Sequence, residues 1–291
     1  MRVVVFVLIT LLNVMAVARE TSASAFVSGA YYRLGDDDPG AAAGSIGSDP
    51  TLDSFSNKLD LARSGSPIYS SDVPSQGPLG DKLSMAFANE GLGGPASPGL
   101  YSRATTLPMI EQGYALEAWV KAGPTNLASV RNDLLAYNGD PASNGFGFFL
   151  HDENYVARVG TFERVLGPAP IGAWHHLAYV KTFDTVDYYY DGKLVDETTG
   201  DPLAVAASGG FWLGGMGNVS SGPGSFLFNG WIDEVRYQTF NPLAAGAFNP
   251  TDFLIRPIPE PSSACVAACG VVFLLASRWL RPLLKPKKLS P

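Results

Sequence analysis

The segment from Tyr114 to Ala122 alternates residue by residue between two kinds of side chain. Leu116, Ala118 and Val120 fall on one side of an extended chain, and the intervening residues fall on the other. Period-2 alternation of this kind predicts a β-strand with one buried face. Similar short runs recur along the chain, at residues 30–34, 84–89, 145–150, 155–159, 174–182, 186–190, 193–196, 211–214 and 226–238.

Turn residues separate these runs. Asp191-Gly192 lies between two of them, and this dipeptide is the strongest short hairpin signal. The chain has 32 Gly and 22 Pro, which excludes a helical bundle because bundles need long uninterrupted helical patterns. Residues 36–82 predict a long loop with one helical turn near residues 60–63. The sequence therefore predicts an all-β, two-sheet sandwich.

Four of these segments carry a family resemblance. They are residues 115–121, 172–180, 188–195 and 228–237, and their order resembles the LamG-like jelly roll of concanavalin A-like lectins and glucanases. The resemblance spans residues 31–241 and implies a jelly-roll fold. It selects no activity, because this fold hosts lectins, adhesion modules and hydrolases. The motif residues that we expect to be structural are Trp119, Trp174, His175, His176, Asp191, Gly192, Trp231 and Asp233.

The first residues predict a secretory signal peptide. A basic Arg2, an uncharged apolar run over residues 3–17 and the small-x-small triplet at 16–18 are its three parts. We expect the signal peptide to span residues 1–18, with a second possible cleavage site as late as residue 25. An uncleaved anchor is the alternative. The rest of the predicted organisation is a sandwich over 26–250, a Pro-rich linker over 251–263, a transmembrane or sorting helix over 264–281 and a basic cytoplasmic tail over 282–291.

The last residues resemble a PEP-CTERM sorting signal. The triplet Pro259-Glu260-Pro261 precedes a short apolar segment, and Arg278 and Arg281 begin a basic cluster. The resemblance implies a transient membrane anchor, recognised by an exosortase, on an exported bacterial protein of the cell surface or polysaccharide matrix. A plain C-terminal anchor is the alternative.

No catalytic arrangement emerges from the sequence. Glycan hydrolysis on this fold uses carboxylates that alternate along one strand, so that they share a face. Asp233 and Glu234 are adjacent, which predicts that they point to opposite faces and cannot both reach one sugar. The pair His175-His176 lies on a predicted strand, so one ring points inward and the other outward. These observations predict no enzyme activity.

Calcium is the cofactor that the sequence favours. Ca²⁺ prefers carboxylate and carbonyl oxygens from loops, and LamG-like domains commonly bind it at a rim of the sandwich. The candidate ligands, in the predicted loop before Phe146, are Asp133, Asn138, Asp140 and Asn144. Solvated turn residues are the alternative interpretation.

The acidic charge lies between the two terminal signals, over residues 19–263. Setting aside Arg2 and the five basic residues of the tail leaves 14 of the 20 basic residues against all 27 acidic ones, a net charge of −13. This charge disfavours nucleic acid and anionic lipid as partners. We therefore predict an exported, non-catalytic binding or adhesion protein that recognises carbohydrate or a surface partner through rim loops. The alternatives are a glycan hydrolase and a structural matrix component.

Overall fold

The computed structural model describes residues 26–55, 57–88, 99–108, 113–124, 131–140, 144–160, 162–200, 209–217, 226–243 and 248–255. The predicted signal peptide, the PEP triplet, the apolar segment and the basic tail lie outside these residues. In the described part of the chain, no helix is long and apolar enough to cross a membrane.

The described residues form fifteen strands and one 3-10 turn, Pro250–Asp252, so the all-β prediction is confirmed. The strands are β1 (Phe26–Tyr32), β2 (Ala62–Gly65), β3 (Ile68–Ser70), β4 (Ser84–Ala88), β5 (Gly99–Arg103), β6 (Gly113–Ala122), β7 (Asn132–Asp140), β8 (Asn144–His151), β9 (Asn154–Val159), β10 (Phe162–Pro168), β11 (Trp174–Thr182), β12 (Thr185–Tyr190), β13 (Lys193–Thr199), β14 (Gly210–Leu213) and β15 (Asn229–Phe240).

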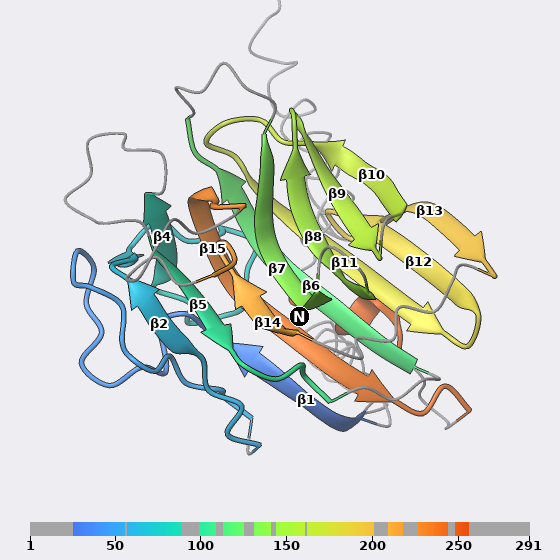
Figure 1. Cartoon of the computed structure of the whole chain (residues 1–291), viewed down its shortest axis with the longest axis horizontal. Coiled ribbons are helices and arrows are strands. Elements are labelled where there is room, and N and C mark those ends of the chain that lie inside the picture. Colours follow the sequence, from blue (N-terminus) through green and yellow to red (C-terminus); the bar gives the residue numbers. More distant parts are fainter. Residues whose placement is uncertain are drawn as a thin grey trace, which may run out of the picture. The chain divides into compact units, whose positions relative to one another are not determined.

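The strands form two antiparallel sheets that pack face to face (Figure 1). The first sheet has the order β13-β12-β11-β6-β15-β4-β3, and β1 also pairs with β15. The second sheet has the order β10-β9-β8-β7-β14-β5-β2. Strands far apart in sequence, such as β6 and β15, pair at the centre of the first sheet, as expected for a jelly roll.

The core lies between the sheets and is rich in aromatic rings. The predicted buried face of β6 is confirmed, because Leu116, Ala118 and Val120 are all fully buried in it. Tyr114 packs against Phe146 of the opposite sheet, with ring centroids 4.6 Å apart. The outer faces of the two sheets therefore remain available for other contacts.

Residues 248–255 cover part of the outer face of the first sheet. Phe253 packs with Ala115, Ala178 and Tyr189 in a small cluster on that face. The indole Nε1 of Trp119 donates a hydrogen bond of 2.8 Å to the carbonyl of Leu254. The packed unit thus runs to Ile255.

The predicted hairpin at Asp191-Gly192 joins β12 to β13. Both residues have positive φ, +50° and +72°, as a two-residue type I′ turn requires. The Asp191 carboxylate also accepts a 2.9 Å hydrogen bond from the backbone N–H of His176, which fixes the turn against β11.

Two sequence predictions of loops are wrong. The expected helical turn near residues 60–63 is part of strand β2, and β3 also lies in the predicted loop. These strands have four and three residues, too few to show an alternating pattern. The predicted loop before Phe146 is largely strand β7. Polar residues at both ends of this strand favour turns, although its central residues are apolar.

Candidate functional site

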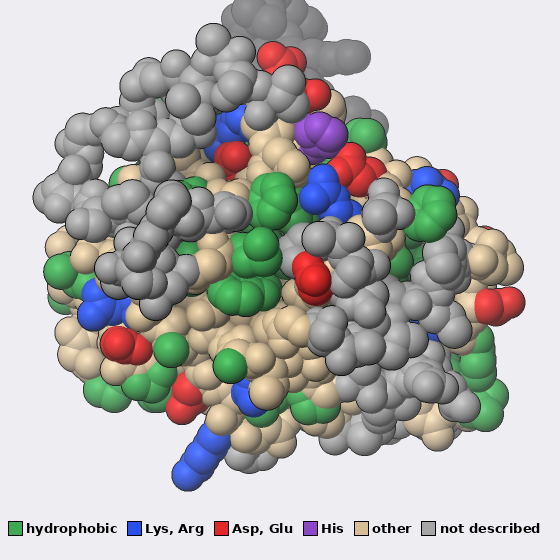
Figure 2. All heavy atoms as spheres, in the orientation of Figure 1, with side chains coloured by type: hydrophobic (Ala, Val, Ile, Leu, Met, Phe, Trp, Pro, Cys, Tyr) green, Lys and Arg blue, Asp and Glu red, His purple; other side chains and the backbone are tan. Residues whose placement is uncertain are grey.

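One row of residues crosses the outer face of the second sheet. Register pairs connect these residues from strand to strand, and they are Glu163, Arg158, Gly147, Tyr137, Trp212, Ser102 and Ala62. We call this set the outer row. Figure 2 shows hydrophobic side chains gathered near the middle of the molecule in the same view as Figure 1, with charged side chains beside them.

Aromatic side chains form the floor around the outer row. Tyr137 and Trp212 are direct register partners, and Phe149 packs edge-on against Tyr137 with ring centroids 5.4 Å apart. Phe226 and Met216 pack against the same cluster. Tyr137 and Phe149 are fully buried, so the half-buried Trp212 and Phe226 are the rings of this group that can meet the apolar face of a sugar or another ring.

Two polar atoms at the centre of the outer row lack partners. The Tyr137 hydroxyl and the Trp212 indole Nε1 are shielded from solvent and have no hydrogen-bond partner among the residues that the structure describes. A buried polar group without a partner costs free energy, so such groups are rare and call for an explanation. Here two hydrogen-bonding groups lie side by side on neighbouring strands, next to aromatic rings.

A charged network borders the aromatic floor. Arg158 lies over the Phe149 ring, 4.0 Å from its centroid, and donates from Nε to the Glu163 carboxylate at 2.8 Å. His151 Nδ1 lies 2.7 Å from the other oxygen of Glu163, and Arg158 also donates to Asn132 at 3.1 Å. Burial alone would raise the pKa of Glu163, but the hydrogen bonds from Arg158 and His151 outweigh it and lower that pKa.

Gly147 makes room for the Tyr137 ring. A Cβ at this position would lie 2.1 Å from the carbonyl oxygen of Ala136 and 2.8 Å from the Tyr137 ring. A side chain at residue 147 would therefore push β8 away from β7 and displace the Tyr137 ring.

The predicted calcium ligands do not converge. Asp133 and Asp140 are seven residues apart on strand β7, a separation of about 23 Å at the usual rise of a strand. Asp133 pairs with Arg131 at 2.6 Å, and the Asn138 side chain accepts a 2.8 Å hydrogen bond from the Leu107 N–H. Asp140 and Asn144 are register partners at the other end of β7, so this pair alone stays together.

The motif histidines lie on opposite sides of β11. The buried His176 contacts Glu117 on the outer face, with Nε2 and Oε2 2.8 Å apart. His175 lies 2.9 Å from the Asp191 carboxylate and stacks on Tyr190.

The motif tryptophans hold the outer face of the first sheet. The Trp174 Nε1 donates to Asp72 at 2.9 Å, and Asp72 also forms an ion pair with Lys121. The Lys121 ammonium lies over the ring of Trp231, 4.9 Å from its centroid. These contacts tie the loop that contains Asp72 to strands β6, β11 and β15.

Asp233 and Glu234 overturn the argument from alternation. A β-bulge interrupts the pairing of β15 with β6 between Asp233 and Arg236, and Glu234 has a positive φ of +49°. Because the bulge breaks the alternation, both carboxyl groups approach that of Asp81, instead of pointing to opposite faces. Asp36 completes a group that we call the carboxylate cluster: Asp36, Asp81, Asp233 and Glu234.

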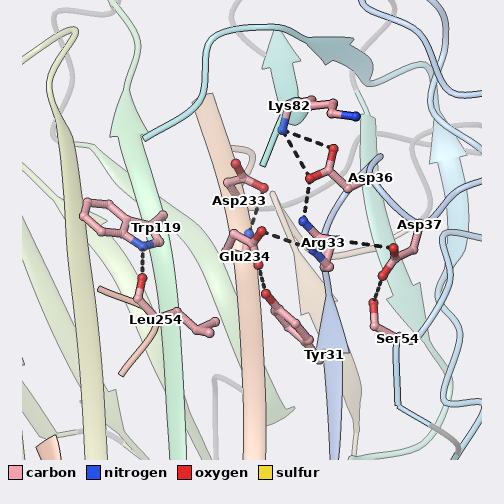
Figure 3. A network of polar contacts seen from close by, with 10 residues as sticks. All are labelled: Tyr31, Arg33, Asp36, Asp37, Ser54, Lys82, Trp119, Asp233, Glu234 and Leu254. Carbon is pink, nitrogen blue, oxygen red and sulfur yellow. Dashed lines mark hydrogen bonds and ion pairs between the residues drawn. The ribbon is translucent and has the colours of Figure 1, made fainter. Parts of the chain in front are cut away.

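Burial and mutual repulsion raise the pKa values of carboxyl groups in the carboxylate cluster, of which Figure 3 shows Asp36, Asp233 and Glu234. Burial, and then the charges of Glu234 and Asp36, raise the pKa of Asp81 to about 7. Burial and the neighbouring Asp81 and Glu234 raise the pKa of Asp233 well above its ordinary value. The sequence does not reveal this group, because Asp36 and Asp81 come from a region that predicts only a solvated loop.

The comparisons with known proteins address the fold. Residues 96–240 match a laminin G family model, described as the concanavalin A-like lectin/glucanases superfamily. The fold of the sandwich is therefore of the concanavalin A-like type. A search of curated proteins finds no match.

Solved structures of this type share the architecture of the domain. Domain 4 of AbnA, a GH43 extracellular arabinanase from Geobacillus stearothermophilus, in complex with arabinotriose, is similar with a TM-score of 0.51 and 16% identity over 76% of this chain and 94% of that chain. The binding domain of botulinum neurotoxin serotype C1 is similar with a TM-score of 0.51 and 10% identity. That match covers 77% of this chain and 49% of the toxin domain. At these identities the likeness establishes the fold alone.

Proposed function

We propose that this concanavalin A-like domain binds carbohydrate, without cleaving it, at the outer row of the second sheet. The observation that carries the proposal is the pair Tyr137 and Trp212, two neighbouring rings with unpartnered polar atoms. Trp212 is half-buried and can present part of its ring to the apolar face of a sugar, while the buried Tyr137 packs beside it from the neighbouring strand.

The charged network favours binding over hydrolysis. Hydrolysis of a glycoside uses two carboxyl groups on either side of the scissile bond. Glu163 is the one carboxylate of the outer row, and its hydrogen bonds with Arg158 and His151 occupy both of its oxygens. The network is suited to orient sugar hydroxyls at the edge of the aromatic floor.

The comparison with the arabinanase domain supports a sugar as the ligand. That protein's structure contains arabinotriose, an oligosaccharide, on the same type of fold. Arabino-oligosaccharides are therefore the first probes to use.

A glycan array followed by titration calorimetry of the positive glycans tests the proposal. We expect Trp212→Ala to weaken binding at least tenfold, and Trp231→Ala, a matched change on the other sheet, to leave it unchanged. Absence of binding to every glycan would favour a structural matrix role, and release of reducing sugar would favour a hydrolase.

We also propose export, followed by PEP-CTERM sorting to the cell surface or matrix. This part rests on the sequence of residues 1–18 and on Pro259, Glu260, Pro261, Arg278 and Arg281. In a strain that lacks the exosortase, the protein should keep a larger mass and stay with the membrane. An unchanged mass and location in that strain would argue against processing of the tail.

A further inference from the structure

Strands β10 and β13 lie side by side along one side of the sandwich (Figure 1). β10 is the last strand of the second sheet, and β13 is the last strand of the first. Arg164 of β10 forms an ion pair with Asp196 of β13, with nitrogen and oxygen 3.4 Å apart. The two sheets therefore end in one common surface, which we call the β10–β13 edge and which comprises residues 162–168 and 193–199.

The opposite side of the sandwich is closed by the loop between β1 and β2. The backbone of Tyr69, on β3, exchanges hydrogen bonds of 2.8 and 2.9 Å with the backbones of Gly44 and Ser45. Arg63, on β2, donates from its backbone N–H to the Asp49 carboxylate at 3.0 Å. In the described part of the chain, no segment covers β13 in this way, and five of its seven residues are exposed.

Apolar side chains are exposed on both strands of the β10–β13 edge. Val165 of β10 is 61% exposed, and Leu194 and Val195 of β13 are 54% and 43% exposed. A β-bulge leaves Val195 without a register partner on β12. Adjacent exposed apolar residues on an edge strand mark a surface that pairs with another strand, because edge strands also present unpaired backbone donors and acceptors.

The charged residues of β13 are complementary to a second copy of the same strand. Lys193 comes first on the strand, Glu197 follows four residues later, and Val195 lies midway between them. If two copies of β13 pair antiparallel and centre on Val195, the Lys193 of each copy lies opposite the Glu197 of the other. A parallel pairing in register would place like charges opposite each other. The charges therefore favour the antiparallel arrangement.

We propose that this chain forms a two-fold dimer in which β13 docks antiparallel against β13 of a second copy. An isologous contact uses one patch twice, so it makes two Lys193–Glu197 ion pairs and one contact between the two Val195 side chains. Two seven-residue strands form a small interface, so we expect a monomer at micromolar and a dimer at millimolar protein concentration.

The dimer does not rest on the proposed function of the outer row. It would nevertheless carry two outer rows, and a polysaccharide with repeated binding sites would then be held with higher avidity than by a monomer.

Disulfide trapping tests the geometry in the full chain, in mild detergent, with Cys265 and Cys269 changed to serine. Val195→Cys places one thiol of each copy at the two-fold axis, where opposite residues have Cα atoms about 4.5–5.5 Å apart, a distance that a disulfide spans. We expect mild oxidation to convert most of this variant to a covalent dimer on a non-reducing gel. Leu79→Cys is the control, because Leu79 is 81% exposed on the loop between β3 and β4, at the other end of the first sheet, and it should stay monomeric.

Charge reversal, followed by sedimentation velocity over a concentration series, tests the ion pairs. Lys193→Glu should weaken dimerisation about tenfold, because two pairs of glutamates then lie opposite each other. Adding Glu197→Lys to that variant should restore dimerisation, and both residues are exposed, so the Tm of the monomer should not change.

Three results would overturn the proposal. They are a wild type that is monomeric at millimolar concentration, a Lys193→Glu variant that dimerises as well as the wild type, and a Val195→Cys variant that gives no more covalent dimer than Leu79→Cys. The second result would show that the copies associate through another part of the chain. Each result leaves glycan binding at the outer row unaffected, so failure of the dimer and failure of the proposed function are distinguishable.

Discussion

Glu117 is the residue whose replacement tests the packing of residues 248–255. Its carboxylate is 1% exposed and accepts hydrogen bonds from Arg236 Nε at 2.6 Å and from the Leu254 N–H at 2.8 Å. His176 Nε2 lies 2.8 Å from the same carboxylate. A single side chain thus connects three strands of the sheet to the segment that covers them.

Glu117→Ala leaves the Arg236 guanidinium without its buried partner. Removing one member of a buried ion pair costs about 3–5 kcal/mol. For a domain of this size, that loss lowers Tm by roughly 6–20 °C. The Leu254 N–H also loses its acceptor, so residues 248–255 should detach from the sheet before the rest of the domain unfolds.

Circular dichroism melting gives the stability, and hydrogen exchange read by mass spectrometry gives the local effect. In Glu117→Ala, a peptide covering residues 248–255 should exchange faster than in the wild type. Glu197→Ala, an exposed carboxylate of β13, is the control and should change the stability by no more than about 0.5 kcal/mol. A loss below about 1 kcal/mol for Glu117→Ala, or unchanged exchange of the peptide, would refute the reasoning, because a partnered buried charge cannot be removed so cheaply.

Three further predictions concern pH and the glycine positions. Burial alone would raise the pKa of Glu117, but Arg236 and His176 lower it. The ionised carboxylate therefore stabilises the fold above the pKa of an unfolded glutamate. This stabilisation is lost as the pH falls through the lower pKa of the folded state. Melting between pH 5 and 3 should thus reduce the Tm of the wild type more steeply than that of Glu117→Gln, and parallel slopes would contradict this. Gly147→Ala should lower the free energy of unfolding in urea by about 1–3 kcal/mol and weaken glycan binding, because the added Cβ overlaps Ala136 and Tyr137. An unchanged free energy of unfolding would show that β8 moves to accept the Cβ and would contradict this prediction. Gly192→Ala should cost about 1–2 kcal/mol in the same assay, because φ is +72° there, and an unchanged midpoint would count against the type I′ turn.

Local patterns account for the part of the fold that the sequence predicts correctly. The alternation over residues 114–122 depends only on which side chains meet the core, and the Asp191-Gly192 turn depends only on two backbone angles. Both signals are complete within a few residues. The sequence does not predict strand β7, because the Asn, Asp and Gly residues at its ends favour turns. Pairing with β8 and β14 overrides that preference.

The candidate sites depend on register between strands that are distant in sequence. Tyr137 and Trp212 meet only because β7 pairs with β14, and no short motif contains both residues. Similarly, the Asp233-Glu234 pair predicts divergent side chains until the bulge is known. The bulge lies in the pairing of β15 with β6, so it is a property of the assembled sheet.

The position of residues 248–255 also sets how the domain would be presented. These residues lie on the outer face of the first sheet, and the outer row lies on the outer face of the second. Under the proposed function, a large polysaccharide would therefore approach the face opposite to the one that residues 248–255 cover, and it would not compete with these residues for Trp212.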